Sequence, residues 1–418
     1  MTLRAIDCQS FAGGFTLGTV QAGFELVGKR ELPGGFGVAS CEANRHILGN
    51  NWETQVGPWN EWEVKPAEYV FGNPPCSGFS LMSASTFRGI DSPVNSCMFA
   101  FVEYAARVNP LIAVFESVQQ AYTQGRPLMQ NLRALLEART GQQWHMYHVL
   151  HNAYCVGGCA VRRRYFIVFS RIPFGVERFE FDQYPTLWDA IGDLEDVNEN
   201  TWASQPYGKA KPSWWSAPLR NPHGTVDGFT WRNTPLSRRA WSLLDYTYWL
   251  PDEPLSYLAR RVYKKTGTLP SPYWDAFTEK LVSTDFAMGF NQMMRWNPDS
   301  PSRVITGAAP QLVVHPTQNR LLTLRECARI MGFPDDWRIE PLKDISNTPA
   351  IWGKGITTAA GRWISTWVAQ AIDGWHGKET GTEIGERENL IDHTWSSKRA
   401  QRIYSNRTIG RHQAEDAA

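Results

Sequence analysis

The chain has 418 residues, 42% of them hydrophobic, so it is long enough for two domains and can bury a core. Its formal net charge of +1 gives no general basic field, so nucleic-acid binding would need local basic patches. No apolar run is long enough for a transmembrane helix, and we expect a soluble, cytoplasmic protein without a membrane partner. The seven cysteines are scattered, and the one close pair, Cys155 and Cys159, has no matching second pair, so neither disulfides nor a metal site are predicted.

The first pattern along the chain is typical of a nucleotide-type cofactor site. A short strand ends at Asp7, and a glycine-containing turn leads into a helix-like segment over 16–22. Such a turn brings backbone N–H groups close to a polar cofactor. A second strand ends at Glu31, where these folds place a ribose-binding acid, and Glu42 is a competing candidate.

Cys76 lies on a stiff turn, because Pro74 and Pro75 before it have fixed φ angles and no backbone N–H. The apolar run over 68–71 predicts a buried strand, and ligands bind at the C-terminal ends of such strands. From this segment alone, a nucleophile and a buried structural cysteine are equally good interpretations.

Two later segments place polar side chains at the ends of predicted strands. Residues 110–115 are a buried strand followed by Glu116, whose carboxylate would reach the same crevice as Cys76. Arg162 and Arg164 share one face of a strand that runs to residue 169, and could hold a phosphate and a base edge. A solvated run of charge is the alternative for the arginines.

The alternation of strands and helices fades after about residue 173 and resumes after 315. Between them, basic pairs interleave with aromatic residues, which suits either a domain that touches a polyanion or a plain irregular domain. Thr323 and Glu326 have the capping-box spacing and predict a helix start. A final amphipathic helix follows residues 353–357.

In this order the segments resemble the DNA (cytosine-5) methyltransferases, over roughly residues 3–170 and 303–373. The matching motifs are the cofactor loop over 7–15, the nucleophile motif Pro74-Pro75-Cys76, the acidic motif Glu116-Ser117-Val118, the arginine pair Arg162 and Arg164, and the most specific one, 320–334. The resemblance implies an α/β fold with a Rossmann-like S-adenosyl-methionine-dependent methyltransferase sheet and a smaller, irregular target-recognition domain. The implied domains are the first part of the catalytic and cofactor-binding domain, 1–172, the target-recognition domain, 173–302, the return to the catalytic domain, 303–373, and a polar, mobile tail, 374–418.

The resemblance also implies the chemistry. The Cys76 thiolate would add to C6 of a cytosine flipped out of double-stranded DNA, and C5 would take a methyl group from S-adenosyl-methionine. Glu116, when protonated, would donate to N3, Arg164 would hold O2, and Arg162 would support the phosphate or the active-site loop. The implied cofactor contacts are Asp7, Gln9, Phe11, Gly13, Gly14, Glu31, Asn73, Pro74, Lys354 and Gly355. The enzyme would act as a monomer on DNA of a bacterial or phage-infected cell.

Several positions depart from the family pattern. Gln9 replaces an aromatic residue of the cofactor loop, Phe11 its first glycine, Ser117 the asparagine of the acidic motif and Ala160 a glutamine near the arginines. Packing of the cofactor and base-flipping contacts are expected to change there. RNA methylation would use the same catalytic residues. A catalytically silent nucleic-acid-binding protein on the same fold is a third alternative, against which the retention of Cys76, Glu116 and both arginines argues.

Lys354 is the most suggestive departure, because the family has an asparagine there. A cation near the transferred group would favour a carboxylated donor, carboxy-S-adenosyl-methionine, which would give 5-carboxymethylcytosine. Alternatively, this lysine reaches solvent or pairs with a carboxylate.

Overall fold

The computed structural model describes residues 2–35, 37–80, 83–195, 204–220, 225–227, 294–305, 313–318, 320–338, 350–376 and 386–405. The chain forms two compact units. The first comprises Met1–Tyr184 and Lys354–Ala418, and the second comprises Pro185–Gly353.

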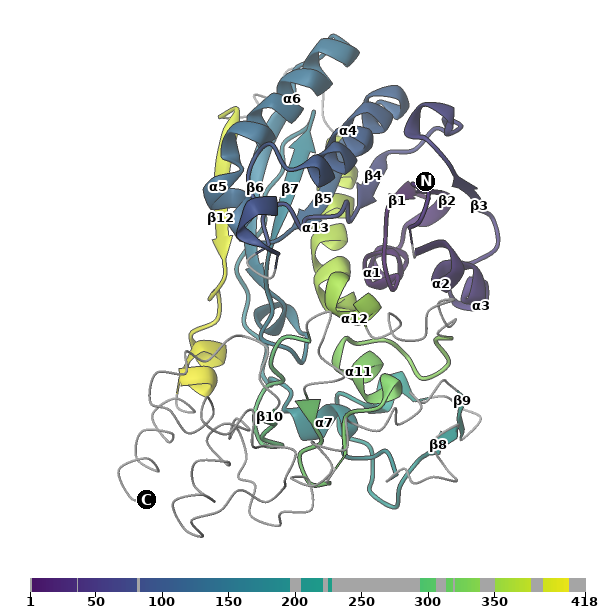
Figure 1. Cartoon of the computed structure of the whole chain (residues 1–418), viewed down its shortest axis with the longest axis vertical. Helices are drawn as coiled ribbons and strands as arrows, with labels where there is room; N and C mark the ends of the chain where they lie inside the picture. Colours follow the sequence, from purple (N-terminus) through teal and green to yellow (C-terminus); the bar gives the residue numbers. More distant parts are fainter. Residues whose placement is uncertain are drawn as a thin grey trace. The chain divides into compact units, whose positions relative to one another are not determined.

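The first unit is built on an eight-stranded sheet with the order β12-β6-β7-β5-β4-β1-β2-β3 (Figure 1). Its strands are β1 (Arg4–Cys8), β2 (Glu25–Glu31), β3 (Glu53–Val56), β4 (Tyr69–Gly72), β5 (Ile112–Ser117), β6 (His145–Asn152), β7 (Arg163–Ser170) and β12 (Glu388–His393). Only β7 runs against its neighbours. The direction of strand addition reverses between β1 and β4, and this switch point is where open α/β sheets bind ligands. The predicted α/β, Rossmann-like fold class is confirmed.

Helices cover both faces of this sheet. They are α1 (Gly14–Gln21), α2 (Gly37–Ala43), α3 (Arg45–Leu48), α4 (Ser96–Val108), α5 (Gln120–Gln124), α6 (Arg126–Thr140) and α13 (Thr358–His376), with short 3₁₀ turns η1 (Trp59–Glu61), η2 (Ser85–Phe87), η3 (Pro93–Asn95) and η4 (Ala153–Val156). Strand residues alternate between the faces, so Cys8 and Phe115 join the core under α4 and α6. On the other face Phe15 of α1 packs on Phe71 and Phe166, with ring centroids 4.8 and 5.5 Å apart.

The α1 and α13 helices touch backbone to backbone, although they lie more than 300 residues apart in the sequence. A Cβ atom at Gly18 would lie 2.3 Å from the backbone nitrogen of Arg362, and one at Gly361 would lie 2.8 Å from the carbonyl oxygen of Gly14. Glycine is therefore required at both positions for this close approach.

The prediction of a mobile tail beyond residue 374 is wrong for the residues that the structure describes there. The α13 helix continues to His376, and Glu388–His393 forms β12, which pairs in parallel with β6. The strand is short and largely polar, so its sequence lacks the apolar run of the other strands. Its stability comes from distant partners: Glu388 accepts hydrogen bonds from Arg126 (2.6 Å) and Gln130 (3.0 Å) and contacts His148 (2.9 Å).

The described part of the second unit contains short elements. They are α7 (Leu187–Ile191), β8 (Ser204–Pro206), η5 (Ala217–Leu219), β9 (Thr225–Asp227), β10 (Met294–Arg295), β11 (Val313–Val314) and α11 (Leu324–Ile330), and α12 (Ala350–Lys354) leads back to the first unit. The predicted capping box is confirmed, since Thr323 and Glu326 exchange both of its hydrogen bonds at the start of α11. Basic pairs at 238–239, 260–261 and 264–265 lie outside the described residues.

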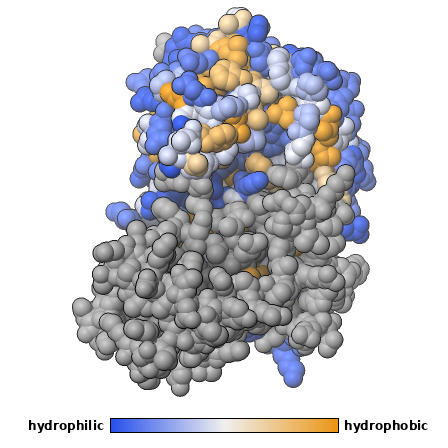
Figure 2. All heavy atoms as spheres, viewed as in Figure 1, coloured by the Kyte–Doolittle hydropathy of each residue, from blue (hydrophilic) through white to orange (hydrophobic). Residues whose placement is uncertain are grey.

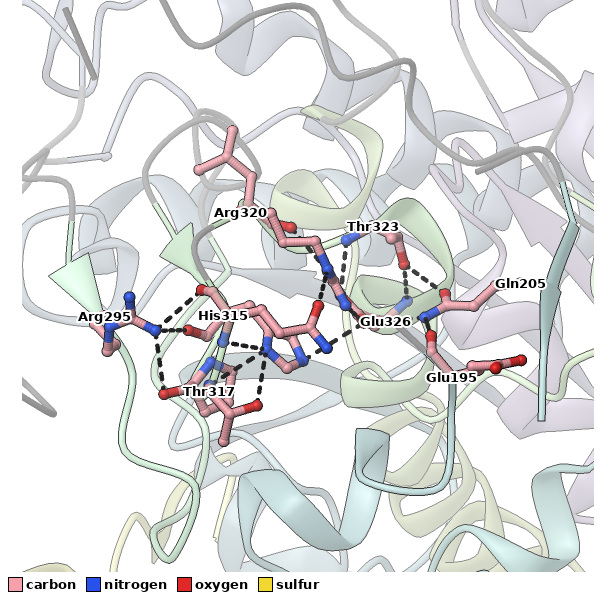
Figure 3. A network of polar contacts seen from close by, with 11 residues as sticks. Glu195, Gln205, Arg295, His315, Thr317, Arg320, Thr323 and Glu326 are labelled. Carbon is pink, nitrogen blue, oxygen red and sulfur yellow. Dashed lines mark hydrogen bonds and ion pairs between the residues drawn. The ribbon is translucent and has the colours of Figure 1, made fainter. Parts of the chain in front are cut away.

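A buried polar network surrounds Glu326 in the second unit (Figure 3). Arg320 makes two hydrogen bonds to its carboxylate, of 2.7 and 2.9 Å, and Gln205 makes a third of 3.1 Å. His315 Nδ1 accepts from backbone N–H groups, so Nε2 carries the proton and faces the carboxylate at 3.7 Å. Burial would raise the pKa of Glu326, but the charge and hydrogen bonds of Arg320 outweigh it and hold that pKa at about 2.

We expect Glu326→Gln to destabilise the protein by about 3–5 kcal/mol, because it leaves the buried Arg320 guanidinium without a counter-charge. The depressed pKa has a second consequence: the carboxylate contributes fully above its ordinary pKa of about 4.5, and the contribution is lost as pH falls toward 2. Urea unfolding at pH 7 and pH 3 measures both effects. A double variant, Glu326→Gln with Arg320→Met, should recover stability at pH 7, and failure to recover would contradict the ion-pair explanation.

No helix within the described ranges is long and apolar enough to cross a membrane. In the view of Figure 2, the described surface is mostly hydrophilic, with smaller apolar areas between the polar residues.

Candidate active site

The turn after β1 is held by a buried ion pair. Asp7 Oδ2 accepts hydrogen bonds from Ser10 (2.6 Å), Thr16 (2.6 Å) and Lys29 (2.8 Å), and the side chains of Asp7 and Lys29 are fully buried. Lys29 also donates to Ser10. Asp7 therefore fixes the conformation of the predicted cofactor loop through hydrogen bonds to other residues of the protein. Its second carboxylate oxygen, Oδ1, has no hydrogen bond among the described residues.

The loop itself has two residues in the left-handed region. Gln9 has a φ of 58° and Gly13, at the N-cap of α1, a φ of 92°. Gln9 is buried. Its backbone N–H donates to the Arg30 carbonyl (2.8 Å), and its Nε2 donates to the Cys97 carbonyl (3.1 Å). Phe11 is half-buried. The loop is thus a fixed surface at the end of β1.

Glu31 ends β2 beside this loop and is buried. Its carboxylate accepts a hydrogen bond from the Leu32 N–H (3.1 Å). The carboxylate also packs against Gly35, where an added Cβ atom would lie only 2.3 Å from Glu31 Oε1. Burial raises its pKa to about 7 against the opposing charge of Lys29. Glu42, the competing candidate, instead binds Arg45 and Thr54.

The turn that carries Cys76 starts directly at the end of β4. The Asn73 N–H donates to the Cys8 carbonyl (3.2 Å), and the Phe79 N–H closes the turn on the Cys76 carbonyl (3.0 Å). A Cβ atom at Gly78 would lie 2.6 Å from Asn95 Oδ1, so the turn packs tightly on the segment before α4. Cys76 is partly exposed. The two turns, after β1 and after β4, flank the switch point of the sheet.

A carboxylate and two arginines lie near this thiol. Glu116 is buried, accepts from Asn73 Nδ2 (2.8 Å) and pairs with Arg164 Nε (2.9 Å). Arg162 lies just before β7 and is buried. It donates a hydrogen bond to the Gly355 carbonyl (2.6 Å), which connects the two arginines to the residue that follows Lys354. The structure therefore brings together the predicted catalytic residues at the ends of β4, β5 and β7.

The protonation of Glu116 and Cys76 is linked. Burial raises the pKa of Glu116 to about 7 against the opposing charges of Arg164 and Arg162. Burial and the Glu116 charge raise the pKa of the Cys76 thiol to about 11. Between these values the pair holds one proton, and moving it from sulfur to carboxylate gives a thiolate beside a carboxylic acid.

Other predicted residues lie around this centre. Pro74 is buried, and Lys354 is exposed at the end of α12, where partial desolvation lowers the pKa of its ammonium group.

The sequence did not indicate Asn152, whose Oδ1 accepts from the N–H groups of Tyr154 (3.2 Å) and Arg162 (3.0 Å). It fixes the turn that delivers Arg162, and an asparagine at a strand end was its only signal.

This sheet, with one reversed strand and ligand-type turns at its switch point, has the architecture of the S-adenosyl-methionine-dependent methyltransferases. A solved structure described as a candidate DNA modification methyltransferase encoded within prophage Cp (E. coli) shares the fold, with a TM-score of 0.63 at 17% identity over 89% of this chain and 100% of that one. The Entamoeba histolytica methyltransferase EhMeth does too, with a TM-score of 0.54 at 10% identity over 89% and 99%.

The chain belongs to the C-5 cytosine-specific DNA methylase family, whose model matches residues 3–365. Curated relatives include the type II methyltransferase M.XorII of Xanthomonas oryzae pv. oryzae, 27% identical over 365 residues that cover 81% of this chain and 78% of the relative. Another is the type II methyltransferase M.MthTI of Methanothermobacter thermautotrophicus, 26% identical over 347 residues, 79% of this chain and 88% of the relative. The resemblance predicted from the motifs is thus confirmed, and the activity of the family is DNA cytosine C5 methylation with S-adenosyl-methionine.

Proposed function

We propose that this protein methylates C5 of a cytosine flipped out of double-stranded DNA, with Cys76 as the nucleophile. The observation that carries the proposal is the cluster of Cys76, Glu116, Arg162 and Arg164 at one edge of the sheet. A base inside a duplex cannot present its ring atoms to a thiol in such a site, so it must leave the stack. The protein acts as a monomer, and residues 173–302 serve as its target-recognition domain.

The residues at the switch point fit S-adenosyl-methionine. Gly13 precedes α1 with a positive φ, Glu31 ends the neighbouring strand, and Gln9 Oε1 is a buried acceptor without a hydrogen bond among the described residues. Asn73 and Pro74 line the turn on the other side of the switch point. When bound, the cofactor supplies an electrophilic methyl group.

The side chains divide the remaining work. The Cys76 proton moves to the Glu116 carboxylate and the sulfur bonds to C6, which leaves electron density on C5 and negative charge toward N3. After C5 has taken the methyl group, a base removes the C5 proton and the C6–S bond breaks, which restores the Cys76 thiolate. Glu116 in its protonated form donates to N3, and its fixed partners Asn73 and Arg164 orient it. Arg164 holds O2, and Arg162 fixes the backbone at Gly355.

Mass spectrometry of nucleosides from treated DNA tests the proposal. Incubation with S-adenosyl-methionine should yield 5-methylcytosine in duplex DNA and none in tRNA. Product in tRNA alone would favour an RNA methyltransferase. The absence of any product and of a covalent adduct with 5-fluorocytosine DNA would favour a silent binding protein.

The raised pKa of Glu31 predicts a pH-dependent affinity for the cofactor product S-adenosyl-homocysteine. Ribose hydroxyls donate best to an ionised carboxylate, so the affinity should rise as pH increases through about 7, and Glu31→Gln should lower it about tenfold and remove this dependence. Calorimetric titration between pH 6 and 8 measures both. Glu42→Gln is the matched control, since Glu42 is committed to Arg45 and Thr54; an equal effect in this control would refute the assignment.

Transfer of a carboxymethyl group is a second candidate, favoured by Lys354. This lysine directly precedes Gly355, whose carbonyl accepts from the active-site residue Arg162. An ammonium group near the donor would pair with the carboxylate of carboxy-S-adenosyl-methionine. Parallel incubations with the two donors decide between them: methylation alone, in the wild type and in Lys354→Asn, would end this candidate.

A further inference from the structure

The C-terminal segment 386–405 lies outside the region that matches the family model, yet it packs on the elements that carry the active-site arginines. Its strand β12 pairs with β6, and β6 pairs with β7 so that His151 faces Arg164 and Asn152 faces Arg163. Nothing in the proposed reaction uses this segment.

The contacts concentrate on the approach to Arg162. Trp395 and Ala400 pack in a small apolar cluster with Tyr154 and Val161, the residue directly before Arg162. Cys155 Sγ lies 3.6 Å from the Thr394 carbonyl oxygen, which ties the turn η4 to the end of β12. The segment thus contacts both η4 and the residue just before Arg162, at the two ends of the turn that leads into β7.

Arg163 is the most direct link. Successive side chains of a strand point to opposite faces, so Arg163 points away from the face of Arg162 and Arg164. Its guanidinium lies over the Trp395 ring, 5.3 Å from the centroid, within the range of a cation–π contact. Arg163 is the first residue of β7 and pairs with Asn152 of β6, so the contact with Trp395 adds a side-chain restraint to the backbone pairing at this strand end.

We propose that Trp395 is a positioning residue of the active site, which holds the start of β7 through Arg163 and thereby sets the place of Arg164 beside Glu116. The inference rests on the proposed function for its catalytic consequence. It extends the catalytic unit by a segment outside the family-matched region. Trp395 touches neither DNA nor cofactor in this role; it acts through the arginines.

The kinetic test compares Trp395→Ala with the wild type at equal amounts of folded protein. We expect kcat/KM on DNA to fall about tenfold and affinity for S-adenosyl-homocysteine to stay unchanged. Trp395→Phe, which keeps a ring, should restore activity. Leu390→Ala is the matched control, because Leu390 is an exposed apolar residue on the same segment, at 54% exposure.

A second measurement does not depend on turnover. The charged and polar groups around Glu116 and Cys76 are Arg162, Arg164 and Asn73, with His151 near the arginines. Arg164 holds the pKa of both acids down, so its displacement in Trp395→Ala should shift the pH profile of Cys76 alkylation by iodoacetamide to higher pH, as read from the mass of the Cys76 peptide. A merely structural contact would leave this profile in place.

A shifted profile in Trp395→Ala, absent in Leu390→Ala and reversed in Trp395→Phe, supports the inference even if the wild type proves inactive on DNA, a result that would refute only the proposed function. An unshifted alkylation profile overturns the inference, whether or not Trp395→Ala also loses stability.

Discussion

Cys76→Ala should reduce methyl transfer to DNA at least about a thousandfold, because it removes the thiol that we propose adds to C6. The substitution removes one sulfur atom from a turn that backbone hydrogen bonds and Gly78 hold in place, so the fold and the binding of S-adenosyl-homocysteine should be unchanged. The measurement is single-turnover transfer of a labelled methyl group.

A trapping experiment separates loss of the nucleophile from loss of structure. DNA with 5-fluorocytosine at the target should form a stable adduct with the wild type and none with Cys76→Ala, since fluorine cannot leave as a proton does. Cys97→Ala is the control, because Cys97 is the other partly exposed cysteine and its backbone carbonyl remains available to Gln9. An adduct in Cys76→Ala would remove Cys76 from the mechanism.

Glu116→Gln should reduce transfer between about a hundredfold and ten-thousandfold, the usual effect of losing a positioned acid. Glutamine keeps the volume and can still contact Asn73 and Arg164, but it cannot donate an acidic proton to N3. Adduct formation with 5-fluorocytosine DNA should slow by a comparable factor, which places the defect in the addition step.

The pH dependence gives a sharper test of the same residue. In the reactive form, Cys76 is a thiolate and Glu116 a carboxylic acid, so the two groups together carry one proton. The pair holds one proton between about pH 7 and pH 11. In the wild type kcat/KM should therefore rise as pH increases through about 7 and then level off. In Glu116→Gln the break near 7 should vanish, and the rate should keep rising until the thiol itself ionises. A break near pH 7 in both proteins would assign it to another group.

The sequence was informative wherever local patterns decide structure. Buried strands ending in polar residues predicted the places of Cys76 and Glu116, and the capping box predicted the start of α11. The strand predictions succeeded because strands of one direction end at the same edge of a sheet, and the capping box succeeded because it depends only on two residues three positions apart.

The sequence was uninformative where distant segments meet. The strand β12 depends on contacts of Glu388 with Arg126 and His148, more than 230 residues away, and its own composition resembles a solvated tail. Likewise Asp7 was predicted as a ligand residue, whereas the structure gives its Oδ2 three internal donors, including Lys29, because the register of β1 and β2 places them side by side.

The close approach of α1 and α13 has a consequence for how the protein is made. Seven of the eight strands of the sheet are complete once the first 170 residues have left the ribosome, but Gly18 must wait for Gly361 and Arg362 to be synthesised. At an ordinary rate of translation this leaves the apolar face under α13 uncovered for roughly ten seconds or more. The nascent chain is therefore a natural client for chaperones. A circular permutation that places α13 and β12 ahead of β1 should shorten this period and raise the yield of folded protein.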